Sequence, residues 1–131
     1  MSLQITLPWP PSVNQYWRHV STGPCAGRVL VSAEGRSYRQ LALQAVLMQR
    51  AVKRLEGRLR VHVLAYPPNR QKRDLDNLAK SLLDAMTHAG VYGDDSQIDD
   101  LRIQRARDER GELILGAKVL VSIEEVGELC A

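Results

Sequence analysis

In several stretches of this chain, apolar and polar residues alternate from one position to the next, as they do in half-buried strands. Residues 3–7 alternate in this way, and three prolines within residues 8–11 bring the stretch to an end. Residues 12–27 are rich in turn-forming residues and predict a loop. Residues 28–31 predict a second, short strand.

Two other segments space their apolar residues as helices do. The first begins at Ser32, a residue type that caps helices, and its apolar positions recur over residues 38–55. The second should run from residue 74 or 75 to Ala89, with Gly90 as its C-terminal stop. Its apolar stripe consists of Leu75, Leu78, Leu82, Ala85, Met86 and Ala89.

Three further stretches predict strands, namely residues 59–66, 98–107 and 113–123, the last two joined around residues 108–111. The order of elements is then β, β, α, β, α, β, β. It indicates an α+β fold in which a small mixed β-sheet is covered by two packed helices. Since the chain has 131 residues and no repeat or linker, we expect a single domain over residues 1–131.

Charge divides the chain into two unlike parts. Residues 1–73 carry 12 Lys and Arg against 2 acidic residues, and residues 74–131 carry 6 against 13, which together give the net charge of +3. Arginine outnumbers lysine 14 to 4, and its planar guanidinium suits phosphate recognition. The pattern indicates a surface for a polyanion beside a metal-binding centre, although an ordinary arginine-rich surface has the same composition.

Several classes of protein are disfavoured. No apolar run is long enough to cross a membrane and the N-terminal residues do not resemble a signal peptide, so we expect no membrane partner and a cytoplasmic location. Cys25 and Cys130 have no zinc-like spacing and do not make a disulfide scaffold. The sequence has no phosphate-binding glycine loop, nucleophile elbow or zinc-protease helix.

The clearest chemical signal lies at the start of the second predicted helix and just after its end. Asp74, Asp76 and Lys80 are followed there by a second acidic pair, Asp94 and Asp95. Carboxylate oxygens bind Mg²⁺, which takes up charge that develops on a phosphate, and a lysine can neutralise the remainder. This combination indicates a magnesium-dependent enzyme that cuts phosphodiester bonds.

The same residues also fit purely structural roles. Asp74 can cap the helix, Asp76 can complement its dipole and pair with Lys80, and Asp94 and Asp95 can serve a turn. An EF-hand loop starting at Asp74 is excluded, because its positions 5, 6 and 12 would hold Leu, Ala and Ala. The residues alone leave the choice between catalysis and a structural role open.

The order and spacing of several motifs resemble those of the RusA-type Holliday junction resolvases, small crossover junction endodeoxyribonucleases of bacteria and their prophages. The resemblance covers nearly the whole chain. Its motifs are residues 5–12 with Asn14, Tyr16 and Arg18, residues 31–35 with Tyr38 and Arg39, residues 73–78 with Lys80, and Asp84 and Ala85 with residues 94–97.

This resemblance implies a homodimer that resolves four-way DNA junctions by paired symmetric nicks, with Mg²⁺ as cofactor and Mn²⁺ as a possible substitute. It assigns the metal site to Asp74, Asp76 and Asp95 and the essential lysine to Lys80, whereas Asp94 is expected to shape the turn. Branched DNA is then the expected partner. Residues 21–28 form a longer loop than the family pattern, which affects loop contacts with the junction and not the chemistry.

Basic and aromatic residues near these motifs are candidates for contacts with DNA. Arg70, Lys72 and Arg73 directly precede the acidic motif and are expected to hold phosphates. Weaker candidates for phosphate contacts are Arg18, Arg28, Arg36 and Arg39. Candidates for stacking on unpaired bases are Trp9, Tyr16 and Trp17, of which Trp9 also suits core packing.

Two other functions stay open. A protein that binds junctions without cutting them would be expected to lack one of the acids or the lysine, and none is missing. A metal-dependent nuclease that acts on flaps, RNA or another branched nucleic acid would carry the same residues. A junction resolvase and a nuclease with another substrate differ in the surface that recognises the shape of the nucleic acid, and the sequence does not define this surface.

Overall fold

The structure, a computed structural model, describes residues 2–128 of the chain. The elements in chain order are β1 (Ser2–Pro8), α1 (Val13–Tyr16), β2 (Trp17–His19), β3 (Val29–Val31), α2 (Ala33–Met48), β4 (Arg58–Tyr66), α3 (Asp76–His88), the 3-10 helix η1 (Asp95–Gln97), β5 (Ile98–Arg105) and β6 (Lys118–Gly127).

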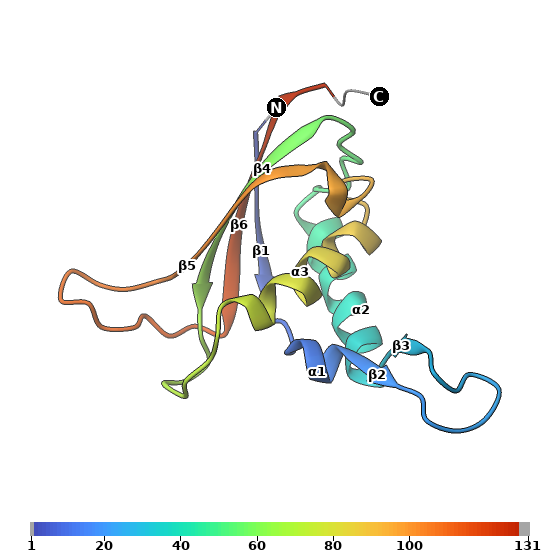
Figure 1. The fold of residues 1–131 in the computed structure, drawn as a ribbon. Coiled ribbons are helices and arrows are strands. Elements are labelled where there is room, and N and C mark those ends of the chain that lie inside the picture. The colour runs from blue at the N-terminus through green and yellow to red at the C-terminus, as the bar shows by residue number, and fades with distance from the viewer. Residues whose placement is uncertain (1, 129–131) are drawn as a thin grey trace.

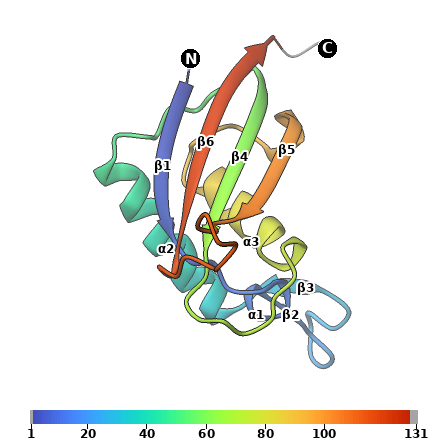
Figure 2. The ribbon, with the colours of Figure 1, turned by 90° about the vertical axis from the view of Figure 1, so that its left-hand side faces the viewer.

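Four strands form a mixed sheet in the order β1-β6-β4-β5. Strands β4 and β5 are parallel, and β6 is antiparallel to both β1 and β4. Helices α2 and α3 cover one face of this sheet (Figures 1 and 2). The two-stranded ribbon β2–β3 projects beyond the N-terminal end of α2, away from the sheet (Figure 1). The predicted α+β architecture with a mixed sheet and two covering helices is confirmed.

One hydrophobic core lies between the sheet and the two helices. Along β4 the buried residues alternate with partly exposed ones, as the sequence predicts for a strand with one covered face. The opposite face of the sheet is polar, since Arg60 contacts Asp100 at 3.2 Å and Glu124 at 3.3 Å. Core residues from β4 and α3 include Leu59, Val61, Val63, Ala65, Leu78, Leu82, Ala85 and Met86.

The first predicted helix is correct at its start and wrong at its end. The Ser32 hydroxyl caps α2 by accepting a hydrogen bond from the Gly35 amide, 3.0 Å away. The helix stops at Met48 and not near residue 55, because Arg50 has a left-handed φ of 56° and turns the chain. Residues beyond the turn such as Leu55 are still buried in the core, which explains why the apolar pattern continues past the helix.

Residues 12–27 are not only a loop. Ser12 and Gln15 form a capping box around the single-turn helix α1, and the chain then enters β2, which pairs with β3. The N-terminal part of α2 lies so close to α1 that a Cβ at Gly35 would overlap the Tyr16 carbonyl oxygen. Two helices were expected. Helix α1 is a third, and its four residues are too few to show helical periodicity in the sequence.

The C-terminal strands are shorter than predicted or shifted along the chain. Strand β5 ends at Arg105 and β6 begins only at Lys118, instead of residues 107 and 113. An isolated bridge between Arg107 and Leu113 closes part of the loop between them. Among residues 2–128, no helix has the length and apolar character needed to span a membrane.

Candidate functional site

Helix α3 presents the first acidic pair at its N-terminal end. Asp74 and Asp76 are both exposed, and the N-cap position belongs to Leu75, which makes no capping bond through its side chain. Asp74 contributes only its backbone carbonyl, which accepts a hydrogen bond from the Asn77 amide at 3.2 Å. The expectation that Asp74 caps this helix is therefore wrong. Asp76 lies in the first turn, where its charge complements the helix dipole.

Lys80 lies one turn further along the same exposed face of α3. Its ammonium group is 5.0 Å from the centroid of the Trp17 ring, a cation–π contact that joins α3 to β2. No ion pair joins Lys80 to Asp76 in residues 2–128, so the alternative of a simple helix ion pair is not realised. Lys80 and Asp76 therefore do not neutralise each other within the described residues.

In the second acidic pair, Asp94 has a structural role, whereas the side chain of Asp95 has no bonding partner among the described residues. Asp94 caps η1, accepting hydrogen bonds from the Ser96 amide and hydroxyl, and these bonds hold the pKa of Asp94 below its ordinary value. The expected turn role of Asp94 is confirmed. Asp95 is the first residue of η1, is exposed, and makes no side-chain hydrogen bond or ion pair within the described chain.

Gln97 fastens this turn to the fold, a role that the sequence motif did not assign. Its side-chain amide is buried and donates to the carbonyls of Leu55 and Gly57, both at 2.9 Å. Its side-chain oxygen accepts from the Asp94 amide at 2.8 Å. The spacing Asp-x-x-Gln is that of a capping box, a signal from which the role could have been found.

The predicted carboxylates do not gather into one closed cluster. Across residues 2–128, no three His, Cys, Asp or Glu side chains are grouped closely enough to hold a metal ion. Burial raises the pKa of Tyr92, and the charges of Asp95 and Asp84 raise it further. Asp76 is eight residues from Asp84, or about 12 Å along a helix axis.

The donor chemistry of these acids nevertheless suits a hard divalent cation. Asp74, Asp76 and Asp95 are exposed and free of hydrogen bonds or ion pairs through their side chains to any described residue. Carboxylate oxygens in this state are the ligands that Mg²⁺ binds. The structure thus supports the type of ligand and does not bring all three ligands together.

The basic loop before α3 is only partly available for phosphate. Arg70 contacts Glu112 at 3.1 Å, with both side chains exposed, and such surface pairs are weak and exchangeable. Arg73 donates to the carbonyls of Asn69 and Gln71 and lies 5.8 Å from the Trp9 ring centroid. Lys72 is exposed and makes no ion pair among the described residues.

A partly buried polar network behind the site was not foreseen. Arg39 contacts Asp84 at 2.8 Å, and both bond to the hydroxyl of Tyr16, so α1, α2 and α3 meet at one point. Burial favours a lower pKa for Arg39, but its bonds to Asp84 and Tyr16 outweigh burial and raise it. Two predictions are thereby corrected, because Arg39 is not free for phosphate and Tyr16 is fully buried and cannot stack on a base.

Arg18 and Trp17 lie on the projecting ribbon. Arg18 is exposed on β2 and has no ion pair in the described part of the chain. Trp17 is half-buried, tilted against Tyr16 with 4.2 Å between ring centroids, and covered by Lys80. Trp9 is also half-buried and packs against the core, as expected for a residue at a strand end.

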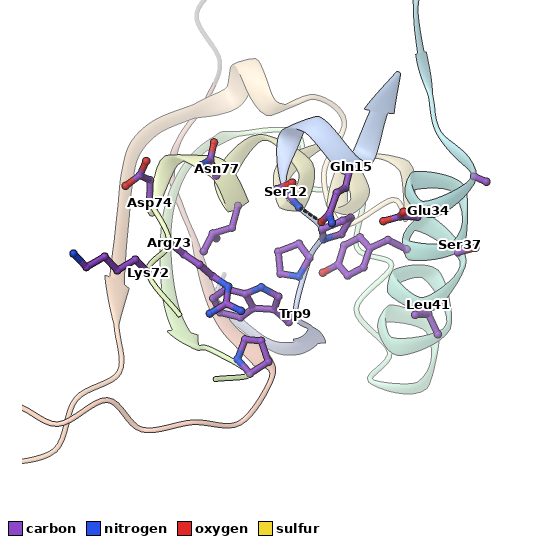
Figure 3. A pocket seen from close by; sticks show the side chains of 16 residues that line it. Trp9, Ser12, Gln15, Glu34, Ser37, Leu41, Lys72, Arg73, Asp74 and Asn77 are labelled. Atoms are coloured by element: carbon purple, nitrogen blue, oxygen red, sulfur yellow. Dashed lines mark hydrogen bonds between the residues drawn. The ribbon is translucent and has the colours of Figure 1, made fainter. Parts of the chain in front are cut away.

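A pocket of about 650 Å³ opens beside the first acidic pair. Asp74, just before α3, and Asn77, in its first turn, line one part of it, and α2 lines another (Figure 3). Trp9 and Arg73 lie next to each other in the middle of its wall (Figure 3). Asp74 therefore borders a cavity and not a flat surface.

Comparison with known proteins identifies the family of this chain. Residues 8–116 match the family model for endodeoxyribonuclease RusA, so the chain belongs to this family. Its relatives include the crossover junction endodeoxyribonuclease rusA of Enterobacteria phage HK97, which is 36% identical over 123 residues, and RusA of Escherichia coli K12, which is 37% identical over 123 residues. Each alignment covers 94% of this chain and 94% of the relative.

Proposed function

We propose that this protein is a structure-specific endodeoxyribonuclease that resolves four-way DNA junctions by paired symmetric nicks in the presence of Mg²⁺. One observation carries the proposal: Asp74 and Asp76 are exposed carboxylates without side-chain partners among residues 2–128, they lie between a basic loop and Lys80, and Asp74 lines a cavity. Membership of the RusA family supports it, because relatives that match over 94% of the chain are named crossover junction endodeoxyribonucleases.

In this proposal Asp74 and Asp76 hold the divalent cation, and Asp95 is the third carboxylate. When bound, the cation neutralises charge on the scissile phosphate and lowers the pKa of an attacking water. Asp95 is attached to a turn that Asp94 and Gln97 rigidify, so its contribution is testable separately from that of the α3 pair.

Lys80 provides a fixed positive charge on the same face of α3 as Asp76. Its ammonium group is held over the Trp17 ring and is exposed, so it can approach a phosphate without moving the backbone. A positive charge positioned before reaction stabilises the negative charge that develops on the phosphate oxygens or on the leaving oxygen.

Lys72, Arg70 and Arg18 hold flanking phosphates in this proposal. Lys72 is unpaired among residues 2–128, and the exposed pair of Arg70 with Glu112 can exchange its carboxylate for a phosphate. Arg18 extends the basic surface to the β2–β3 ribbon. Contacts of this kind fix position on DNA and do not read sequence.

The working unit is proposed to be a homodimer. A four-way junction is approximately two-fold symmetric, and this chain offers one acidic site, so two copies about a two-fold axis supply the two nicks. Sedimentation at micromolar concentration should give the mass of two chains. A stable monomer that makes paired symmetric nicks would contradict this, and a monomer that nicks once would indicate a different substrate.

The experiment that tests the function uses labelled four-way junction, flap, linear duplex and branched RNA, each incubated with Mg²⁺, with Mn²⁺ or with a chelator. We expect symmetric nicks in the junction only when a divalent ion is present, mapped at nucleotide resolution. Binding without cleavage would favour a junction-binding protein, and preferential cutting of flaps or RNA would favour a nuclease with another substrate.

A further inference from the structure

The pocket beside Asp74 has walls suited to a flat, aromatic ligand. The segment after β1, the first turns of α2 and the loop before α3 enclose its roughly 650 Å³. This volume lies within the range of about 300–1,000 Å³ typical of sites for small ligands. Figure 3 shows Trp9 and Arg73 in the middle of the wall, with Ser37 and Leu41 of α2 on the side away from Asp74.

The wall offers stacking surfaces that are held in place. Trp9 is anchored by its backbone amide, which donates to the Ala117 carbonyl at 3.1 Å, and the Arg73 guanidinium lies 5.8 Å from its ring centroid. Tyr38 also lines the pocket but is buried, so its role is structural: its hydroxyl donates to the Pro8 carbonyl at 2.7 Å and holds α2 against the end of β1. Aromatic rings and guanidinium planes are the surfaces on which proteins stack unpaired bases.

Neutral hydrogen-bonding groups lie at the edge of the pocket. Asn77 makes no side-chain hydrogen bond to any residue in 2–128, and Gln15 uses only its side-chain oxygen, which accepts from the Ser12 amide at 3.3 Å. Its amide donors are therefore available. Amide groups match the donor and acceptor pattern of base edges.

We infer that this pocket receives one unpaired nucleobase from the DNA strand that is held at the acids. The inference rests on the proposed function, because the base must belong to a strand whose phosphate lies near Asp74. Positive charge from Lys72 and Arg73, which both line the pocket, favours the backbone of the same nucleotide. The open centre of a junction is where bases can leave the stack with least loss of pairing.

A substitution that fills the pocket tests this inference. Ser37 is exposed on α2 and lines the pocket, so Ser37→Trp blocks the space without disturbing the core. Gln40→Trp is the matched control, because Gln40 is exposed on the same helix and does not line the pocket. Both variants and the wild type are assayed for affinity in chelator on junctions that carry an abasic site at each position around the crossover in turn.

For the wild type, removing the base at one crossover position should weaken binding by about 5- to 150-fold, the range expected for one stacked base. The same removal should have no effect on Ser37→Trp, whereas Gln40→Trp should keep the wild-type profile. Cleavage of the intact junction with Mg²⁺ is measured in parallel.

Three results would overturn the inference. The wild type could be insensitive to abasic sites at every position, or Ser37→Trp could keep the wild-type profile. Ser37→Trp could also change the mass of the assembly instead of the abasic profile, which would assign the pocket to a contact between copies. If the wild type cleaves no junction at all, the proposed function itself fails, and this inference fails with it.

Discussion

The two aspartates of each acidic pair have different surroundings, and this difference decides which of them are available for chemistry. Asp94 is engaged by Ser96 and holds a turn, whereas Asp95, the next residue, is unengaged in the described chain. Before and within the first turn of α3, the side chains of Asp74 and Asp76 likewise have no hydrogen-bond or ion-pair partner in residues 2–128, and neither of them caps the helix. Their side chains can therefore accept a cation without breaking existing bonds.

Replacing Asp74, Asp76 or Asp95 singly by Asn should lower single-turnover cleavage by at least about 100-fold, on the scale of losing one preorganised electrostatic group. Junction binding should survive or tighten, because each change removes negative charge near phosphate. Rates and affinities are measured on the same four-way junction.

Asp100→Asn is the control for these variants, because Asp100 is exposed on the opposite, polar face of the sheet and contacts Arg60. It should leave both rate and affinity near the wild-type values. Loss of binding with normal cleavage of saturated complexes would contradict the assignment of any of the three acids to metal ligation.

Lys80→Ala should abolish cleavage with little change in stability or affinity. The side chain is exposed and, among residues 2–128, its polar head is engaged through the cation–π contact with Trp17, so its removal leaves the core intact. Lys80→Arg, which keeps the charge, should retain part of the rate. Lys53→Ala is a matched change at an exposed lysine that lies outside the acidic motifs in the sequence. Near-normal single-turnover rates for Lys80→Ala would show that the lysine has no catalytic role.

At the scale of elements, the basic loop is placed by its neighbours on both sides. Arg73 bonds back to the loop carbonyls, and Arg105 of β5 donates to the Arg73 carbonyl, which ties the loop to the sheet edge. Arg70 reaches Glu112 in the loop before β6. The loop thus presents Lys72 outward on a fixed frame.

Neutralising Arg70, Lys72 and Arg73 together should weaken binding to all DNA forms. The slope of log affinity against log salt should flatten by about one unit for each phosphate that the protein no longer neutralises. Among single variants, Lys72→Ala should change the slope most, because the two arginines already have protein partners. An unchanged slope in the triple variant would place the DNA-binding surface elsewhere.

At the scale of the whole molecule, buried tyrosines make folding sensitive to alkaline pH. Burial raises the pKa of Tyr16, Tyr38 and Tyr92 above the ordinary value of 10.0. A raised pKa in the folded state means that the neutral form is favoured there. The resulting stability is complete below pH 10.0 and is lost as the pH rises above it.

The free energy of unfolding should therefore fall as the pH rises beyond about 10. Tyr38→Phe removes one of these ionisations and should make the alkaline decline shallower. At neutral pH it should cost about 1 kcal/mol, because the hydrogen bond to the Pro8 carbonyl is removed. Denaturant titrations of both proteins across this pH range provide the measurement. An identical alkaline decline in the variant would exclude Tyr38 as a contributor.

The sequence by itself determined the features that depend on neighbouring residues. The alternation in β1 and β4, the Ser32 cap, the stripe of α3 and the stop at Gly90 are all set within a few positions of the chain, where spacing alone decides which face is apolar. The acidic motif was found in the same way, since its members lie close together in sequence.

Only the tertiary structure decided which distant residues meet. The placement of β6 between β1 and β4, the contact of Arg39 with Asp84 and the pocket between Trp9 and α2 join segments that are far apart along the chain. The early end of α2 is of the same kind, because Leu55 is apolar for packing on the core and not for helical periodicity. Such contacts depend on how whole elements pack, and they cannot be predicted from the spacing of neighbouring residues.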